Sequence, residues 1–167
     1  MEAFLGEVLQ RILPEGCSHA IYPFQGKGDL LKKLKSRLCG YARWLPEDCR
    51  IIVVVDRDAD DCRDLKKRLE KVAAVAGLRT RTASGAKTWQ LVNRIVVEEL
   101  EAWYFGEWEA VRSAFPGLPS TPPQTRAFRH PDAVSGGTWE AFERVLKRNG
   151  YFKTGLRKIE AARAIGA

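Results

Sequence analysis

The most restrictive feature of the chain is an apolar run that ends in acidic residues. Residues 51–55 read Ile-Ile-Val-Val-Val, and residues 56–61 contain four aspartates. A short run of β-branched residues is typical of a buried strand in a parallel sheet that helices cover on both faces. Ligands of such sheets bind beyond the carboxyl ends of the strands. The sequence therefore predicts that the aspartates lie at the edge of the sheet where a site would form.

The aspartates need a neutralising cation or partial protonation, because carboxylates this close together repel one another. Hard oxygen ligands on a short loop suit Mg²⁺ or Mn²⁺. We therefore predict a metal site with Asp56 and Asp58 as ligands and Asp60 as a further one. The structural alternative is that Asp60 or Asp61 is the N-cap of the following helix. An N-cap needs one residue, however, and does not account for Asp56 and Asp58.

Three kinds of protein have acidic loops with similar spacing. An EF-hand loop beginning at Asp56 needs Gly at its sixth position and Glu at its twelfth, where this chain has Asp61 and Lys67. Phosphatases of the haloacid-dehalogenase type also have Asp-x-Asp after an apolar strand, but usually continue with Thr or Val where this chain has Asp60. The TOPRIM fold of topoisomerases, primases and overcoming-lysogenization-defect nucleases has Asp-x-Asp after one strand and Glu after an earlier one. The spacing excludes the EF-hand, favours TOPRIM and leaves the phosphatase as second choice.

Length and composition predict one globular domain. The 167 residues are 45% hydrophobic and 29% charged, without a disordered or low-complexity tract. No apolar run approaches a membrane span and the N-terminus lacks a signal-peptide pattern, so we expect a cytoplasmic protein that makes no membrane contact. The cysteines include no C-x-x-C pair, and the histidines are His19 and His130. This argues against a zinc site.

The charge balance points toward an acidic partner. Lys and Arg number 28 against 21 Asp and Glu, which gives a net charge of +7. A basic exterior around an acidic metal site suits a phosphodiester substrate, so nucleic acid is a possible partner. For each basic cluster taken alone, a solvated helix face is the ordinary interpretation.

Helical and strand patterns alternate along the chain. Apolar spacing predicts helices at residues 4–13, 30–38, 61–76, 137–148 and 157–164, and an aromatic helix around residues 103–105. Strands are predicted at residues 19–24, 51–55, 78–82 and 91–97. The alternation predicts an α/β fold with a largely parallel sheet flanked by helices, in a TOPRIM-like or Rossmann-like arrangement.

The expected domain organisation is a core with a helical extension. Residues 1–115 are predicted to form the TOPRIM-like α/β core. Residues 116–167 are predicted to form a proline-rich loop and C-terminal helices packed on the same domain. A connection as long as residues 116–137 is more often functional or mobile than slack.

Charged residues outside the aspartate loop could complete the site. Glu99 and Glu101 follow the last predicted strand, where they could be metal ligands or could simply occupy the first turn of a helix. Lys27, between two glycines, and Lys153 could contact a phosphate. Alternatively, the glycines around Lys27 form an ordinary tight turn, and Lys153 is a surface lysine without a special role. His130 is a weaker candidate for a general acid or base.

Short motifs follow one another through nearly the whole chain: Met1-Glu2-Ala3-Phe4-Leu5, Gln25-Gly26-Lys27-Gly28-Asp29-Leu30, Val55-Asp56-Arg57-Asp58, Glu99-Leu100-Glu101-Ala102-Trp103, Pro131-Asp132-Ala133 and Gly137-Thr138-Trp139. In this order they resemble a bacterial, TOPRIM-like family, domain-of-unknown-function family 4276. The resemblance implies a metal-dependent nuclease that often works beside an ATPase. It implies Asp56 and Asp58 as metal ligands and Glu2 as the outer acid of the first acidic motif.

The resemblance also implies that part of the site lies outside this chain. In related sequences a first strand ending in Glu-Gly precedes the helix at residues 4–13, so we expect that strand and its glutamate to lie upstream of Met1. Related chains also continue beyond Ala167.

The sequence thus predicts a Mg²⁺- or Mn²⁺-dependent, nuclease-like domain that hydrolyses nucleic-acid phosphodiesters, with Asp56, Asp58 and Glu2 as catalytic residues. Two alternatives stay open. One is a catalytically degenerate module that docks on an ATPase through Trp103, Trp108 and the proline-rich loop. The other is a small-molecule phosphatase that uses Asp56.

Overall fold

The computed structural model describes residues 1–85, 88–97, 99–123 and 137–167, which form two compact units. The first, here called the sheet unit, is Phe24–Val97. The second, here called the helical unit, combines Met1–Pro23 with Glu98–Ala167. This grouping differs from the division after residue 115 that the sequence suggested, because each unit has a hydrophobic core of its own.

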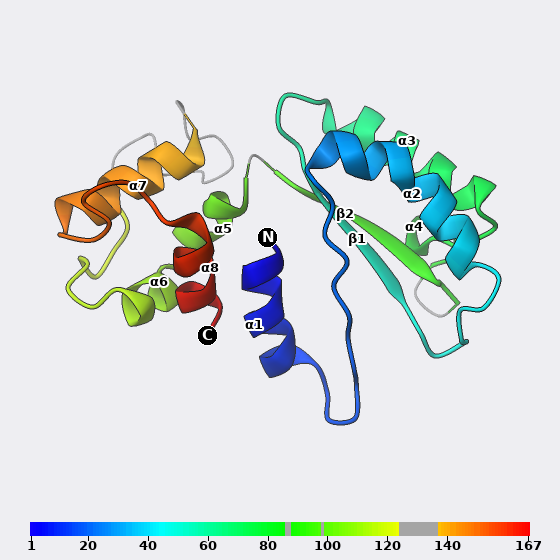
Figure 1. The fold of residues 1–167 in the computed structure, drawn as a ribbon, viewed down its shortest axis with the longest axis horizontal. Coiled ribbons are helices and arrows are strands. Elements are labelled where there is room, and N and C mark those ends of the chain that lie inside the picture. The colour runs from blue at the N-terminus through cyan, green and yellow to red at the C-terminus, as the bar shows by residue number, and fades with distance from the viewer. Residues whose placement is uncertain (86–87, 98, 124–136) are drawn as a thin grey trace. The chain divides into compact units, whose positions relative to one another are not determined.

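The sheet unit is built on two parallel strands (Figure 1). Strand β1 is Ile51–Asp56 and strand β2 is Leu91–Val96, and the two pair along their whole length. The predicted strand with its acidic end and the later apolar strand are therefore confirmed. The described residues form an α/β arrangement with a parallel sheet flanked by helices, and this sheet is small.

Three helices accompany the sheet in this unit. Helix α2 is Lys27–Tyr41, α3 is Cys62–Val75 and the short α4 is Arg81–Ser84. Apolar residues on one face of α2 and α3 meet the inward side chains of the strands, and the resulting core includes Leu30, Leu34, Leu38, Val53, Val55, Leu65, Leu69 and Leu91. The predicted helices at residues 30–38 and 61–76 are thus confirmed. Gly77, with φ of +78°, follows the end of α3 in a conformation that favours glycine.

A polar cluster crosses from α3 to β2 inside the sheet unit. Asn93 interrupts the apolar pattern of β2 and is only 2% exposed. Its amide donates to Oε1 of Glu70 at 3.0 Å, and the same oxygen accepts from Lys66 Nζ at 2.9 Å and from Thr82 Oγ1 at 3.2 Å. Lys66 also donates to the backbone carbonyl of Asn93 at 2.7 Å. The cluster gives the buried side-chain N–H group of Asn93 and the Glu70 carboxylate hydrogen-bond partners, without which they would be costly to bury.

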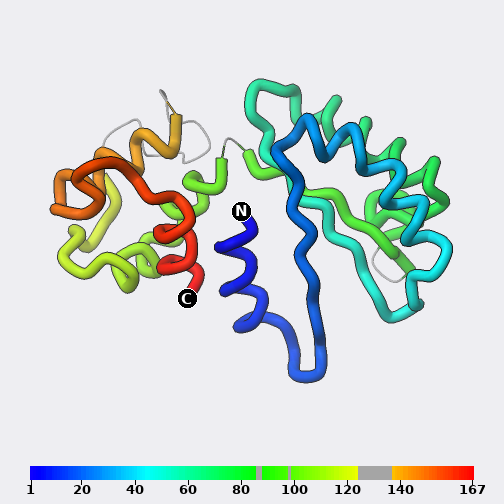
Figure 2. Tube along the Cα trace, viewed as in Figure 1, coloured from blue at the N-terminus to red at the C-terminus, as the bar shows by residue number. Residues whose placement is uncertain are grey.

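Two predicted strands are not formed. Residues 19–24 run without helix or strand between α1 and α2 (Figure 2), since they are mostly exposed and Pro23 lacks the N–H that a central strand would donate. Of residues 78–82, only Thr80 makes a bridge to β2, opposite Leu91. The Thr80 side chain accepts from Ala83 N and so begins α4 as an N-cap instead of continuing a strand.

The helical unit contains five helices in its described residues, and they are α1 (Glu2–Ile12), α5 (Leu100–Gly106), α6 (Trp108–Ala114), α7 (Thr138–Arg148) and α8 (Lys158–Gly166). Its core is aromatic: Phe142 is fully buried, with its ring centre 5.1 Å from that of Tyr104 and 5.8 Å from that of Phe105. The helices predicted at residues 4–13, 137–148 and 157–164 are confirmed. None of the helices described is long and apolar enough to cross a membrane.

Helices α1 and α8, from opposite ends of the sequence, pack closely against each other. A Cβ atom at Gly166 would lie 2.9 Å from the carbonyl oxygen of Phe4 and 3.0 Å from Cβ of Glu7. The absence of a side chain at Gly166 therefore allows the two helices to approach this closely.

The polar cluster predicts an acid-dependent contribution to stability. Burial alone would raise the pKa of Glu70, but hydrogen bonds from the side chains around it lower that pKa below its ordinary value. The ionised form therefore stabilises the fold above the ordinary glutamate pKa, and this contribution disappears as the pH falls through the lowered pKa. Replacing Glu70 with Gln should reduce the free energy of unfolding by about 1–3 kcal/mol at neutral pH.

Denaturant unfolding at neutral and at acidic pH tests this expectation. The difference between the parent protein and Glu70→Gln should shrink at acidic pH. The exposed Glu47, in the same unit, provides the control Glu47→Gln, which should change stability little at either pH. A Glu70→Gln effect of the same size at both pH values would contradict the assignment.

Candidate functional site

The acidic loop begins where β1 ends. Asp56 is the last residue of the strand and is half-buried. Arg57 N donates to Val96 O at 2.8 Å, which extends the pairing of the strands by one residue. The chain then turns, with Asp60 N donating to Arg57 O at 3.2 Å and with Asp58 at a positive φ of 50°. Asp is among the few residue types that adopt this conformation readily. The turn directs the loop back toward the start of α2.

Lys27, the first residue of α2, carries the positive charge that the loop needs. Its Nζ lies 2.7 Å from Oδ2 of Asp58 and 2.9 Å from Oδ2 of Asp60. It also donates to the carbonyl oxygen of Arg57 at 2.8 Å. Gly26, at a φ of +86°, is the N-cap that precedes Lys27. One ammonium group therefore joins α2 to three successive parts of the loop after β1.

The charges around Lys27 favour its protonated form. Burial lowers the pKa of the lysine. The hydrogen bonds and negative charges of Asp58 and Asp60 together raise that pKa by a larger amount, so the net shift is upward. The two carboxylates are half-exposed, with side-chain exposures of 53% and 50%, whereas the Lys27 side chain is 20% exposed. The lysine thus lies beneath two carboxylates that face solvent.

This arrangement bears on two sequence-based expectations. The Lys27 ammonium group, which we expected to contact phosphate, forms ion pairs with Asp58 and Asp60. It thereby supplies positive charge that we had expected from a metal ion. In the described residues, no group of three or more His, Cys, Asp or Glu side chains is arranged to hold a metal ion. What the loop offers is a pair, Asp58 and Asp60, with oxygens directed at a single point.

The expectation that Asp60 or Asp61 is the N-cap of the following helix is confirmed for Asp61. Its Oδ1 accepts from Arg63 N at 2.8 Å and from Asp64 N at 3.0 Å, so Asp61 is the N-cap of α3. Asp60 is not needed for capping. The capping residue and the residues that contact Lys27 are therefore different members of the same acidic run.

The remaining predicted acids belong to the helical unit. Glu99 Oε2 accepts from Thr138 Oγ1 at 3.0 Å and from Trp139 N at 3.2 Å, which satisfies the first turn of α7. Glu101 is 7% exposed and lies 3.5 Å from Lys158 Nζ. Both side chains thus have structural partners within their own unit.

Glu2, Lys153 and His130 complete the set of predicted residues. Glu2 is exposed in the first turn of α1, where a carboxylate is favoured by the helix dipole. Lys153 is exposed in the turn between α7 and α8. His130 lies outside the described residues. The roles proposed for Glu2 and Lys153 stay predictions.

Sequence reasoning missed two features of the sheet unit. It did not predict that Lys27 would pair with the aspartates, although the glycines on either side indicated a special backbone position. It also missed Glu70 and Asn93, for which the signal was Asn93, a polar residue among the buried apolar residues of β2.

The model of the family described as Domain of unknown function (DUF4276) matches residues 1–167. The chain belongs to this family. No curated protein and no solved structure matches it. The family membership expected from the motifs is confirmed, whereas the relation of DUF4276 to TOPRIM nucleases stays a prediction.

In this DUF4276 protein, the contribution of Asp61 can be separated from that of the other aspartates. Asp61→Ala should lower the free energy of unfolding by about 1 kcal/mol, because two N–H groups of α3 lose their acceptor. Asp61→Asn keeps an acceptor oxygen and should cost less. Denaturant unfolding of both variants provides the measurement, and equal losses would show that capping is not the role of Asp61.

Proposed function

We propose that the loop after β1 and Lys27 form the metal and phosphate site of a TOPRIM-like domain that hydrolyses nucleic-acid phosphodiesters with Mg²⁺ or Mn²⁺. The observation that supports this most is the convergence of Asp58, Asp60 and Lys27 at the carboxyl end of a parallel strand. In open α/β sheets this is the edge where ligands bind.

The donor set fits a hydrated divalent ion. Mg²⁺ in proteins commonly has one or two carboxylate ligands and keeps several waters, so a site of three protein ligands is not required. Asp58 and Asp60 already direct one oxygen each at a common positive group, and both are half-exposed. Asp56, at the end of β1, would be the adjacent ligand that the Asp-x-Asp spacing predicts. A divalent ion bound there would stabilise negative charge on the phosphate and activate a water for attack on phosphorus.

A metal ion could displace the Lys27 ammonium group from the two carboxylates. Two positive charges cannot occupy the same pair of carboxylate oxygens without repulsion, so ion binding at Asp58 and Asp60 would release the ammonium. Lys27 remains attached to the first turn of α2, beside the loop, where it can donate to a phosphate oxygen of the substrate. The phosphate contact predicted for Lys27 would then arise only in the metal-bound protein.

Another part of the sheet unit suits a nucleic-acid chain. The guanidinium carbons of Arg50 and Arg81 lie 5.5 and 5.8 Å from the centre of the Trp89 ring. Basic side chains beside an aromatic ring are typical of surfaces that bind single strands through phosphates and bases. The net charge of +7 favours the same class of partner.

The ion pairs of Lys27 also support a second candidate function. A loop that is already neutralised by a lysine is compatible with a degenerate, non-catalytic module that docks on an ATPase. Trp108 is excluded as a docking residue, because it is 6% exposed in the core and its Nε1 donates to Pro119 O at 2.9 Å. Trp103, which is 40% exposed, is still available for such a contact. Absence of metal binding together with stable co-purification of an ATPase would favour this function.

Metal binding and cleavage can be tested separately with three variants. Mn²⁺ affinity measured by calorimetry should fall about tenfold or more in the double variant Asp58→Asn and Asp60→Asn, since both charged ligands are lost. In Lys27→Gln the affinity should instead rise about five- to tenfold, because the competing ammonium is removed. Asp64→Asn, an exposed acid in the first turn of α3, serves as the control and should leave affinity unchanged.

Cleavage of single-stranded DNA and RNA with Mn²⁺ then tests the catalytic proposal. The double variant should lose activity, and Lys27→Gln should cleave more slowly than the parent protein although it binds metal more tightly. Unchanged cleavage in the double variant would refute the site. Metal binding without cleavage by any of the proteins would refute the nuclease function and leave a metal-binding module.

A further inference from the structure

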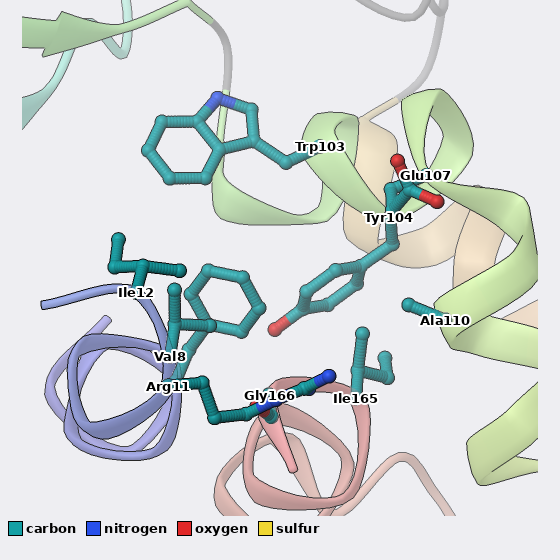
Figure 3. Close-up of a pocket in the computed structure, with 10 residues that line it drawn as sticks. Val8, Arg11, Ile12, Trp103, Tyr104, Glu107, Ala110, Ile165 and Gly166 are labelled. Carbon is teal, nitrogen blue, oxygen red and sulfur yellow. The ribbon is translucent and has the colours of Figure 1, made fainter. Parts of the chain in front are cut away.

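The helical unit contains a pocket that the proposed function does not use. Helices α1, α5, α6 and α8 enclose it, and its volume is 530 Å³ (Figure 3). This volume is in the range of sites for small organic ligands. Most of the wall is apolar or aromatic, with Phe4, Val8, Trp103 and Ile165 among the lining residues. The pocket is therefore able to surround the apolar body of a ligand.

Tyr104 brings a hydrogen-bond donor into this apolar surrounding. The side chain is buried, and Figure 3 shows its ring reaching from α5 toward α1 and α8 with the hydroxyl at the far end. Within the described part of the chain, this hydroxyl makes no hydrogen bond. Burial, with a smaller contribution from the Glu101 carboxylate, raises the pKa of the Tyr104 phenol, so the group stays protonated at neutral pH. A buried hydroxyl of this kind gains from an acceptor supplied by a ligand.

Arg11 adds a positive charge at the same end of the pocket. Its guanidinium lines the pocket, and Nη1 donates to the carbonyl oxygen of Gly166 at 3.3 Å. A guanidinium has five donors, so this one long hydrogen bond leaves others for a ligand. The remaining charged group of the lining, Glu107, lies across the pocket from Arg11 in Figure 3. The polar groups thus form a donor end at Arg11 and Tyr104 and an acidic opposite side.

We propose that this pocket binds a small monocarboxylic acid with an aromatic or aliphatic body. The carboxylate accepts from the Arg11 guanidinium and the Tyr104 hydroxyl, while the body lies against Trp103, Phe4 and Ile165. Glu107 disfavours a second negative charge at the other end of the ligand, which selects a monocarboxylate over a dicarboxylate. Trp103 and Ile12 are 40% and 66% exposed. A bound ligand would cover part of their apolar surface and remove it from water, which favours binding.

Binding of three matched probes to the full chain tests the proposal. Phenylbutyrate, phenylbutanol and phenylbutylamine share one apolar body and differ in the charge at its end. Titration calorimetry, with Trp fluorescence as a second readout, should show phenylbutyrate binding about tenfold more tightly than the alcohol and more tightly than the amine. Equal binding of the three, tighter binding of the amine, or a dissociation constant for phenylbutyrate weaker than about 10 mM would overturn the proposal.

Two variants assign the binding to its residues. Arg11→Gln should weaken phenylbutyrate binding about tenfold and leave the alcohol unaffected, whereas Tyr104→Phe should weaken it several-fold with the ring retained. Arg112→Gln, an exposed arginine on α6 outside the lining, should change neither. Arg11 is exposed, so its replacement should be compatible with folding, and circular dichroism of the variant would check this. Parent-like phenylbutyrate affinity in Arg11→Gln would refute the assignment of the carboxylate contact. These outcomes are independent of metal binding and nuclease activity.

Discussion

Parallel pairing of β1 with β2 is the constraint on which the sheet unit depends. A parallel pair cannot be joined by a tight turn, so the chain must cross over between the strands, and here it does so through α3 and α4. Both strands then end at the same edge. The crossover begins at that edge with the acidic run, and the first residue of α2 reaches it from before β1. The proximity of Lys27 to the aspartates is therefore a consequence of topology and not of sequence neighbourhood.

The acidic residues of the chain illustrate how one residue type serves different physical roles. Asp61 and Glu99 satisfy N–H groups at the starts of helices, where carboxylates are favoured. Glu70 accepts three hydrogen bonds inside the sheet unit. Asp58 and Asp60 are distinct, because their partner is a single lysine and both remain half-exposed. A ligand competes with one ammonium group there, instead of with a network of backbone donors.

The sequence was sufficient to predict the elements that have strong periodic patterns. The helices at residues 4–13 and 61–76 have apolar residues at the helical period, and the strand at residues 51–55 is a short run of β-branched residues. Residues 19–24 show where such patterns are insufficient, because a short apolar segment forms a strand only where a partner strand pairs with it. At Thr80 a local hydrogen bond to Ala83 N competes with strand pairing and prevails.

The candidate site was predicted only where its residues lie close together in the sequence. Asp58 and Asp60 are two positions apart in the sequence, so their grouping was visible from spacing alone. Their contact with Lys27 joins residues about thirty positions apart, and no local pattern reports a contact of that kind. The Tyr104 hydroxyl is a similar case, since its surroundings come from α1 and α8 as well as from its own helix.

The close contact of α1 with α8 at Gly166 has a consequence for the order of folding. The sheet unit is one continuous segment, Phe24–Val97, whereas the helical unit is assembled from residues on both sides of it. During synthesis the sheet unit is complete while α8 is still absent, so the face of α1 that packs on α8 stays uncovered until α8 has been made. Contacts between the two ends of a sequence also form slowly, because a long loop must close. The α1 helix is thus made before the sheet unit but reaches its final environment after it.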